Sequence, residues 1–201
     1  MLYAILKVVF STFFRVLFRA EIIGAENIPR DGAIILAANH LSNWDPPFLA
    51  CFLERQVSYM AKQELFDIPL FGTAIRHCHA FPVKRGEADR SAIKNAVAIL
   101  KKGRCLGLFP EGTRSRTGEL GKAEAGVGLI AAMTGAPLVP AAISGTAEIF
   151  GANGKGKIFP KVILNIGEPM KFVGNRKDKA ALEKFSNDVM KRIAELKNAH
   201  A

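Results

Sequence analysis

The sequence predicts a single α/β domain whose central sheet is largely parallel and flanked by helices. From residue 33 onward, apolar runs of strand length alternate with segments of helical period. This alternation is typical of parallel strands joined by helical crossovers. The chain has 201 residues, which is enough to bury a full core and short enough for one domain. Its 49% hydrophobic and 23% charged residues indicate a globular rather than a disordered chain.

The expected strands are short apolar runs between segments of helical period. The run 33–38 predicts a buried strand, and polar residues follow it directly. We expect strands at 33–38, 57–61, 79–83, 106–109, 138–143 and 162–166.

The expected helices carry apolar residues at helical spacing and have recognisable ends. Asp45 can cap a helix that begins at Pro46, because proline is favoured at the first helical position. The clearest helix has two lysines in its last turn and ends at Gly103. We expect further helices over 67–76, 90–102, 124–134 and 179–196, the last of them packed on the sheet.

Residues 1–20 form a separate segment rich in Leu, Val, Ile and Phe. Lys7, Arg15 and Arg19 interrupt this run, whereas a membrane span needs about 20 predominantly apolar residues. No small-residue cleavage site follows the run, which argues against a signal peptide. At about 100° per residue, the three basic residues and Ser11 share one side of a helix, and apolar residues cover most of the rest.

This pattern predicts a helix in the membrane interface, with basic side chains on lipid phosphates and Phe and Leu among acyl chains. A helix packed on the domain core is the alternative. We favour the membrane because six phenylalanines are more than one packed face needs, at positions 10, 13, 14, 18, 48 and 52. The chain thus divides into a membrane-associating helical segment, 1–20, and a folded domain, 21–201.

The chain is strongly basic, with a formal net charge of +10 and an isoelectric point of about 9.7. Such a chain attracts nucleic acid, anionic lipid headgroups or phosphorylated substrates, and charge alone does not choose among them. Three cysteines without disulfide-framework spacing favour a reducing compartment. The run Arg76-His77-Cys78-His79 predicts no metal site, because adjacent residues of a strand point to opposite faces.

His40 and Asp45 are the first candidates for chemistry. His40 follows the end of a buried strand, and Asp45 stands where the next helix starts. Ligands of open α/β sheets bind at the carboxyl ends of strands. A carboxylate folded back onto the imidazole would fix its tautomer and leave the other nitrogen free to take a proton from an alcohol. This pair is the base and its orienting partner in a catalytic triad that lacks a serine.

A second polar turn, Phe109-Pro110-Glu111-Gly112-Thr113-Arg114-Ser115, also follows a strand. It combines a tight turn, a carboxylate, a guanidinium and two hydroxyls. Turns of this kind aim backbone N–H groups at an anion, and Arg114 can clamp a phosphate with two hydrogen bonds. Two such turns at strand ends predict one site.

At these residues the sequence resembles the glycerolipid acyltransferase family, and within it the bacterial 1-acylglycerol-3-phosphate acyltransferases. The Asn-His-x-x-x-x-Asp run at 39–45 is similar to the family's first motif, and 109–115 to its third. The segments 81–85 and 138–143 are similar to the second and fourth motifs. Lys84 stands where many relatives carry Asp, so the arginine of the second motif is Arg85. Order and spacing agree over roughly residues 22–170.

The resemblance implies that residues 21–201 are an acyltransferase domain that moves a fatty acyl group from a thioester to the sn-2 hydroxyl of 1-acylglycerol 3-phosphate. His40 would be the base and Asp45 its partner. The substrate-binding residues would be Glu111, which positions the acceptor, the phosphate contacts Arg85 and Arg114, and Gly112, Thr113 and Ser115 of the same turn.

Direct transfer of this kind needs no cofactor and no metal. The implied partners are acyl-CoA or acyl carrier protein as donor, lysophosphatidic acid as acceptor and an anionic membrane surface, with no nucleic acid. The implied location is the cytoplasmic face of the cell membrane, peripheral or monotopic.

Three alternatives stay open at this point. The acceptor could be glycerol 3-phosphate or another lysophospholipid, because the motifs are shared across the family. A non-catalytic module for anionic lipid or nucleic acid would explain the charge but not the paired polar turns, and one Trp and two Tyr offer few stacking platforms. A hydrolase would need a nucleophile beside His40, and Ser42 is too close in sequence for its usual geometry.

Overall fold

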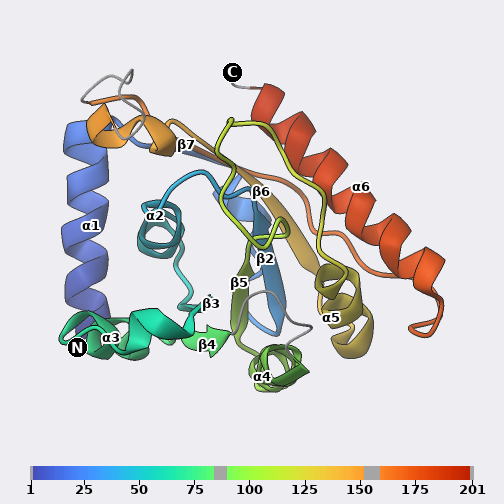
Figure 1. The fold of residues 1–201 in the computed structure, drawn as a ribbon. Helices are drawn as coiled ribbons and strands as arrows, with labels where there is room; N and C mark the ends of the chain where they lie inside the picture. Colours follow the sequence, from blue (N-terminus) through green and yellow to red (C-terminus); the bar gives the residue numbers. More distant parts are fainter. Residues whose placement is uncertain (1, 84–89, 152–158, 200–201) are drawn as a thin grey trace.

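The computed structural model describes residues 2–83, 90–151 and 159–199, and these form one seven-stranded sheet with helices on both faces (Figure 1). The strand order is β1-β7-β6-β2-β5-β3-β4. The strands span Glu21–Ile23 (β1), Ile34–Ala38 (β2), Val57–Lys62 (β3), Phe81–Val83 (β4), Cys105–Leu108 (β5), Leu138–Ser144 (β6) and Ile163–Ile166 (β7).

Five of these strands, from β6 to β4 in spatial order, pair in parallel. β7 runs antiparallel to β6, and β1 pairs in parallel with β7. The predicted largely parallel sheet is therefore confirmed. β1 and β7 form one edge of the sheet and run in the direction opposite to the other five strands.

The helices are α1 (Leu2–Phe18), α2 (Asp45–Phe52), α3 (Phe71–His77), α4 (Arg90–Lys101), α5 (Gly126–Thr134) and α6 (Lys179–Asn198). Short 3-10 turns span Ala25–Asn27 (η1), Gln63–Phe66 (η2) and Thr146–Gly151 (η3). Figure 1 shows α1 and α2 on one side of the sheet and α5 and α6 on the other.

β2 lies at the centre of the sheet and explains why two cores form. Its five residues are all fully buried, as expected for a parallel strand covered on both faces. Ile34, Leu36 and Ala38 face the core beneath α1 and α2, whereas Ile35 and Ala37 face the core beneath α4, α5 and α6. The alternation follows from the two-residue period of a strand.

Two predicted elements between β3 and α4 begin later than expected. The helix predicted over 67–76 starts at Phe71, because Leu70 takes a positive φ of 64° and interrupts the helical path after η2. The strand predicted over 79–83 starts at Phe81, because α3 runs to His77 and His79 adopts a φ of 61°. His77 and His79 thus lie at a helix end and in a turn rather than along a strand.

The N-terminal helix α1 packs on α2, and this packing turns part of the predicted lipid-facing side inward, although Val16 and Leu17 stay exposed. Phe14 and Phe18 are fully buried, and Nζ of Lys7 donates to the carbonyl of Leu53 at 2.5 Å. The guanidinium of Arg15 lies over the ring of Phe52. The expectation of phenylalanines among lipid chains is therefore wrong for Phe14 and Phe18, because both are buried in the core: Phe14 packs on the rings of Phe48 and Phe52 in α2, and Phe18 packs on Phe14 and Phe159.

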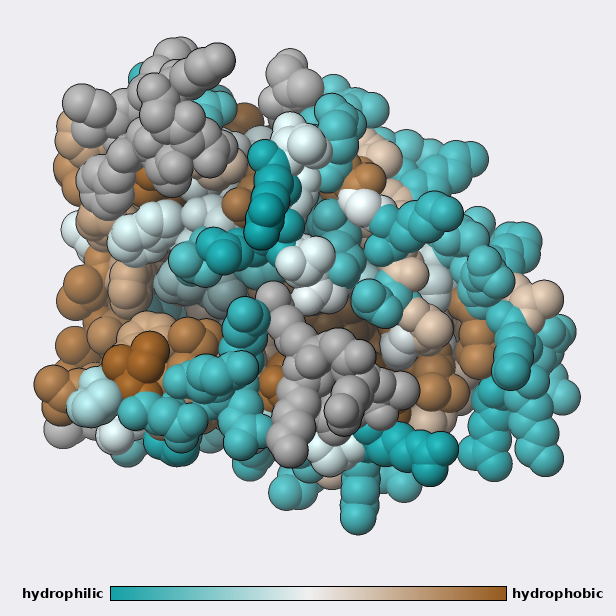
Figure 2. Space-filling model, viewed as in Figure 1, coloured by the Kyte–Doolittle hydropathy of each residue, from teal (hydrophilic) through white to brown (hydrophobic). Residues whose placement is uncertain are grey.

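Aliphatic residues cover the outward face of α1 instead. Figure 2 shows hydrophobic atoms along α1 at the left edge of the view and over the α3 segment below it. The exposed large side chains of α1 are Leu2, Ile5, Val8, Val9, Val16 and Leu17. In the described part of the chain, no helix combines the length and apolar character that crossing a bilayer requires.

Candidate active site

His40 and Asp45 meet across the turn between β2 and α2, as the sequence predicts. Nδ1 of His40 lies 2.8 Å from Oδ2 of Asp45, and both side chains are buried. Because an ionised carboxylate only accepts hydrogen bonds, this contact assigns the ring proton to Nδ1 and leaves the lone pair on Nε2. The geometry is that of an imidazole prepared to accept a proton.

The Asp45 carboxylate also closes the turn that carries His40. Its Oδ2 accepts the backbone N–H groups of Leu41 at 2.6 Å and of Ser42 at 2.7 Å. Our expectation that Asp45 caps a helix starting at Pro46 is wrong, since α2 begins at Asp45 and the bonds of this side chain run back to the turn. The imidazole and the turn amides hold the carboxylate in that direction.

Thr146 supplies a further donor that the sequence analysis missed. Its hydroxyl donates to Oδ1 of Asp45 at 2.5 Å, and the threonine is fully buried. Both oxygens of the carboxylate are therefore hydrogen-bonded, which fixes its plane relative to the imidazole. The available signal was local: Thr146 follows β6 within the polar turn Ser144-Gly145-Thr146, at the same edge of the sheet as His40.

Aromatic rings pack against the face of the imidazole. The ring centroids of His40 and Phe109 are 4.0 Å apart with an interplanar angle of 14°. Tyr59 stacks behind Phe109 at 6.3 Å, and a side chain at Gly107 would collide with the Tyr59 ring. Burial raises the pKa of the Tyr59 hydroxyl well above 10, and this hydroxyl has no hydrogen-bond partner among the described residues. The stack restricts rotation of the imidazole.

The second polar turn lies directly against His40. Glu111 is buried, and its Oε1 accepts the backbone N–H of His40 at 3.0 Å while its Oε2 accepts the N–H of Gly121 at 2.9 Å. The backbone N–H of Ser115 donates to the carbonyl of His40 at 2.8 Å. The two turns are thus joined through the main chain of His40, and the contacts of Glu111 brace this junction.

The exposed tip of the second turn offers donors that the protein leaves unused. Gly112 has a φ of 64°, which suits glycine, and its N–H bonds the carbonyl of Phe109. Thr113 and Arg114 are exposed, and within the described residues no hydrogen bond or ion pair engages either side chain. The Ser115 hydroxyl, in contrast, donates to the carbonyl of Glu119 and closes its own loop.

Asn39 holds the His40 turn to the neighbouring strand. Its Nδ2 donates to the carbonyl of Ile143 at 3.0 Å, and its Oδ1 accepts the N–H of Ile143 at 2.7 Å. The side chain is fully buried and continues the β2–β6 pairing by one residue. Arg85, the remaining predicted site residue, lies outside the described residues.

The two buried cysteines, Cys51 and Cys105, are poor nucleophiles at neutral pH. Burial raises the pKa of the Cys51 thiol and of the Cys105 thiol to about 12, so both stay protonated. Cys51, Cys78 and Cys105 are all free thiols.

Comparison with known proteins agrees with this geometry. The family model described as Acyltransferase matches residues 19–144, which is more than half of the chain. A 1-acyl-sn-glycerol-3-phosphate acyltransferase of Bacillus subtilis is 37% identical over 89% of this chain and 88% of the relative. A protein of the same description from Streptococcus pneumoniae is 36% identical over 72% of this chain and 53% of that relative.

A solved structure gives the same result for the fold. The crystal structure of the 1-acyl-sn-glycerophosphate (LPA) acyltransferase PlsC from Thermotoga maritima superposes with a TM-score of 0.74 and 32% sequence identity. The alignment covers 97% of this chain and 80% of that one. The matched segment contains both polar turns and the strands that carry them. This chain therefore belongs to the Acyltransferase family and is an acyltransferase.

Proposed function

We propose that this enzyme transfers a fatty acyl group from acyl-CoA or acyl carrier protein to the sn-2 hydroxyl of 1-acylglycerol 3-phosphate, giving phosphatidic acid. The observation that carries the proposal is the 2.8 Å contact of His40 with Asp45, set beside a turn with unused anion-binding donors. The names of the relatives from Bacillus subtilis and Streptococcus pneumoniae support this choice of acceptor.

The proposed reaction is a direct transfer. Nε2 of His40 takes the proton of the acceptor hydroxyl while the hydroxyl oxygen forms a bond to the thioester carbonyl carbon. The carbon–sulfur bond then breaks, and the leaving thiolate receives the proton from the imidazolium. A thioester is already an activated acyl donor, so no covalent nucleophile is required. General-base catalysis of this kind contributes about 10²- to 10⁴-fold.

Asp45 would serve this step in two ways. It keeps the proton on Nδ1, and its negative charge stabilises the imidazolium that forms. Thr146 and the two turn amides hold the carboxylate so that it cannot rotate away. Developing negative charge on the thioester oxygen would need N–H donors, for which the backbone of 39–44 or of 110–113 is the available source.

We assign the acceptor phosphate to the exposed tip of the second turn. The Arg114 guanidinium can form two parallel bonds to phosphate oxygens, and the Thr113 hydroxyl lies beside it in sequence. Gly112 and Ser115 would shape the turn. Arg85 would be a second phosphate contact, as the family resemblance implies.

The outward face of α1 is our proposed membrane surface. Six large aliphatic side chains are exposed there, and the net charge of +10 favours an anionic bilayer. The ring of Phe13 on α1 stacks on Trp44 in the His40 turn at 5.6 Å, so the helix is rigidly connected to the site. We place the enzyme at the cytoplasmic face of the membrane, as a peripheral or monotopic protein.

The contacts of Ser42 argue against a hydrolase. Its hydroxyl accepts the N–H of Trp44, and its own N–H donates to Asp45. Among the described residues, no hydrogen bond joins this serine to the His40 ring. A serine nucleophile would need that bond.

The decisive experiment offers the enzyme a radiolabelled acyl donor, either acyl-CoA or acylated acyl carrier protein. The acceptors are lysophosphatidic acid, glycerol 3-phosphate and lysophosphatidylcholine, each tested separately, and the labelled product is identified. We expect phosphatidic acid as the main product and its loss in the His40→Ala variant. A main product from glycerol 3-phosphate would overturn the acceptor assignment. Free fatty acid formed without any acceptor would overturn the reaction type.

A further inference from the structure

The chain between η2 and α3 makes a strained turn whose apolar side chains project from the surface. The N–H of Phe71 donates to the carbonyl of Pro69 at 2.7 Å, which closes a γ-turn around Leu70. Leu70 has φ 64° and ψ −50°. This form of γ-turn is rare and strained for any residue with a Cβ atom.

Burial does not offset this strain in the isolated protein. Leu70 is 87% exposed, and Ile68 and Phe71 on either side are 47% and 48% exposed. Pro69 is exposed as well. An exposed leucine with positive φ gains neither packing nor a favourable backbone conformation, and such outliers point to a role outside the folded chain.

The turn is nevertheless firmly built. Phe66, just before it, is buried, and the N–H of Gly72 donates to the carbonyl of Ile68 at 2.8 Å. A Cβ atom at Gly72 would lie 2.2 Å from the carbonyl oxygen of Phe66, so only glycine allows this close approach. The apolar side chains are therefore presented by a defined framework.

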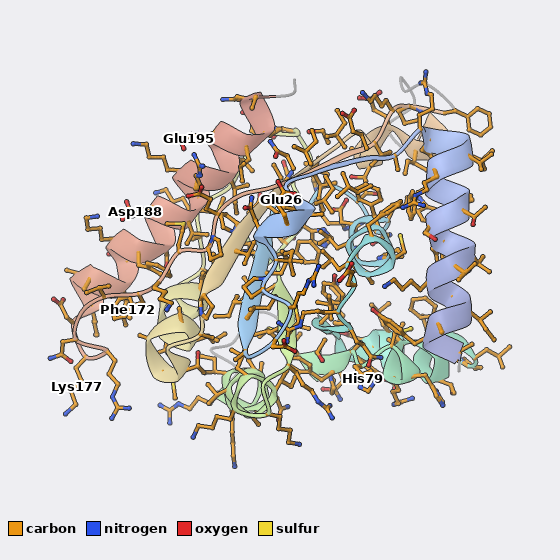
Figure 3. The ribbon with its side chains drawn as sticks, turned by 180° about the vertical axis from the view of Figure 1, so that it is seen from behind. Glu26, His79, Phe172, Lys177, Asp188 and Glu195 are labelled. Carbon is orange, nitrogen blue, oxygen red and sulfur yellow. The ribbon has the colours of Figure 1, made fainter. Side chains whose placement is uncertain are left out.

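The turn belongs to the same end of the molecule as the exposed face of α1. Leu2, Tyr3 and Ala4 of α1 line one surface hollow together with His77 and His79, which end and follow α3. Figures 1 and 3 both place α3 at the first residues of α1, and Figure 3 shows His79 there, far from Phe172 across the sheet. The turn leads into α3, and α3 thus lies at the same end of the molecule as the first residues of α1.

We propose that Ile68, Leu70 and Phe71 form a second membrane-contacting element, which inserts into the bilayer beside α1. This inference rests on the proposed function, because a lipid acceptor has to be collected from a bilayer. A second contact fixes the rotation of the protein about the α1 axis, which a single helix lying on the surface leaves free. The acidic neighbours of the turn, Glu64 and Asp67, offset the basic ones, Lys62 and Arg76. The turn therefore contributes to membrane binding by burial of its apolar groups rather than by charge.

The test measures the partition of the full chain onto vesicles of phosphatidylcholine and phosphatidylglycerol at limiting lipid concentration. We expect Leu70→Ser and Phe71→Ser each to weaken partition at least about fivefold, at low and at high salt alike. The matched control is Val173→Ser, which removes a 91% exposed apolar side chain next to Phe172, on the far side of the molecule. Its partition should equal that of the unmodified chain.

A third variant separates membrane contact from folding. Leu70→Gly should raise the thermal midpoint, because glycine accepts positive φ, and should still weaken partition. A lower midpoint would show that the leucine packs within the protein and would overturn the proposal. Unchanged partition of all three turn variants would overturn it too, as would an equal loss for Val173→Ser.

Two further measurements distinguish a failure of the membrane-contact proposal from a failure of the proposed acyl transfer. Transfer to a water-dispersed short-chain lysophosphatidic acid should be normal in the turn variants, so weak partition with normal transfer supports the proposal. Loss of transfer in every form of the chain would instead count against the proposed function. If lipid-free chain forms a dimer that Leu70→Ser dissociates, the occupant is a second copy and the membrane assignment is overturned.

Discussion

The Glu111 carboxylate accepts the backbone N–H of His40 at 3.0 Å, so a side chain of the second polar turn fixes the main chain of the first. Its other oxygen accepts the N–H of Gly121, so the carboxylate ties the first turn to the loop that follows the second. The carboxylate is therefore already occupied by the protein. A direct contact with the acceptor, as the family resemblance implies, would have to compete with these two bonds.

Replacing Glu111 tests which role dominates. In Glu111→Gln the amide nitrogen cannot accept an N–H, so one buried donor loses its partner at a cost of about 1–3 kcal/mol. We expect a lower free energy of unfolding in urea and a lower kcat, with the KM for the acceptor nearly unchanged. A raised acceptor KM with normal stability would instead support acceptor positioning.

Removal of the His40 imidazole should abolish transfer without unfolding the chain. His40→Ala takes away the proposed base, and we expect kcat to fall by about 10²- to 10⁴-fold. The buried ring is lost, but the backbone bonds to Glu111 and Ser115 remain. The control is His77→Ala, an exposed histidine at the end of α3. Activity of His40→Ala within about twofold of the control would refute the base assignment.

The hydroxyl of Thr146 should matter more than its shape. Thr146→Val keeps the volume but leaves Oδ1 of Asp45 without its donor. We expect kcat to fall about tenfold, which equals about 1.4 kcal/mol, while the KM values stay constant. Thr146→Ser restores the donor and should retain most of the rate. Equal rates for the valine and serine variants would show that Thr146 acts only through packing.

The elements that could be predicted from the sequence are those whose signals are local. The helix predicted over 90–102 matches α4, Arg90–Lys101, because its apolar face and Gly103 lie within a few turns of chain. The meeting of His40 and Asp45 follows from five residues of sequence separation at the end of a strand. In both cases the sequence pattern and the structure that it predicts lie within the same short segment of the chain.

Long-range contacts account for what the sequence could not predict. Thr146 and Asp45 are 101 residues apart, and only the pairing of β2 with β6 brings their turns together. The orientation of α1 also depends on a distant partner, because the carbonyl of Leu53 and the ring of Phe52 draw Lys7 and Arg15 toward α2. A charge pattern shows that a helix has two faces but not which one turns inward.

Arg114 should act on acceptor binding. Its guanidinium is exposed, and Arg114→Ala removes no hydrogen bond or ion pair to a described residue. We expect the acceptor KM to rise about tenfold or more, with unchanged thermal stability and unchanged donor KM. The matched control is Arg116→Ala, an exposed arginine two residues further on. A lower kcat with constant acceptor KM would contradict a phosphate contact.

The two faces of α1 call for different experiments, because deletion would confuse them. Removing residues 1–20 would delete Phe14 and Phe18 and expose the core that they cover. The loss of one buried phenylalanine alone costs about 3–5 kcal/mol. Since a domain has only about 5–15 kcal/mol of stability, we expect the truncated chain to be largely unfolded. Vesicle release by that truncation would therefore say little about the membrane.

Substitution of the outward face tests the membrane directly. Val8 is 65% and Val16 is 70% exposed, so Val8→Asn with Val16→Asn should leave the free energy of unfolding within about 0.5 kcal/mol of the parent. We expect the same double variant to lose at least about tenfold in partition onto anionic vesicles, since two apolar groups no longer leave water. Equal vesicle binding by parent and double variant would remove α1 from the membrane interface.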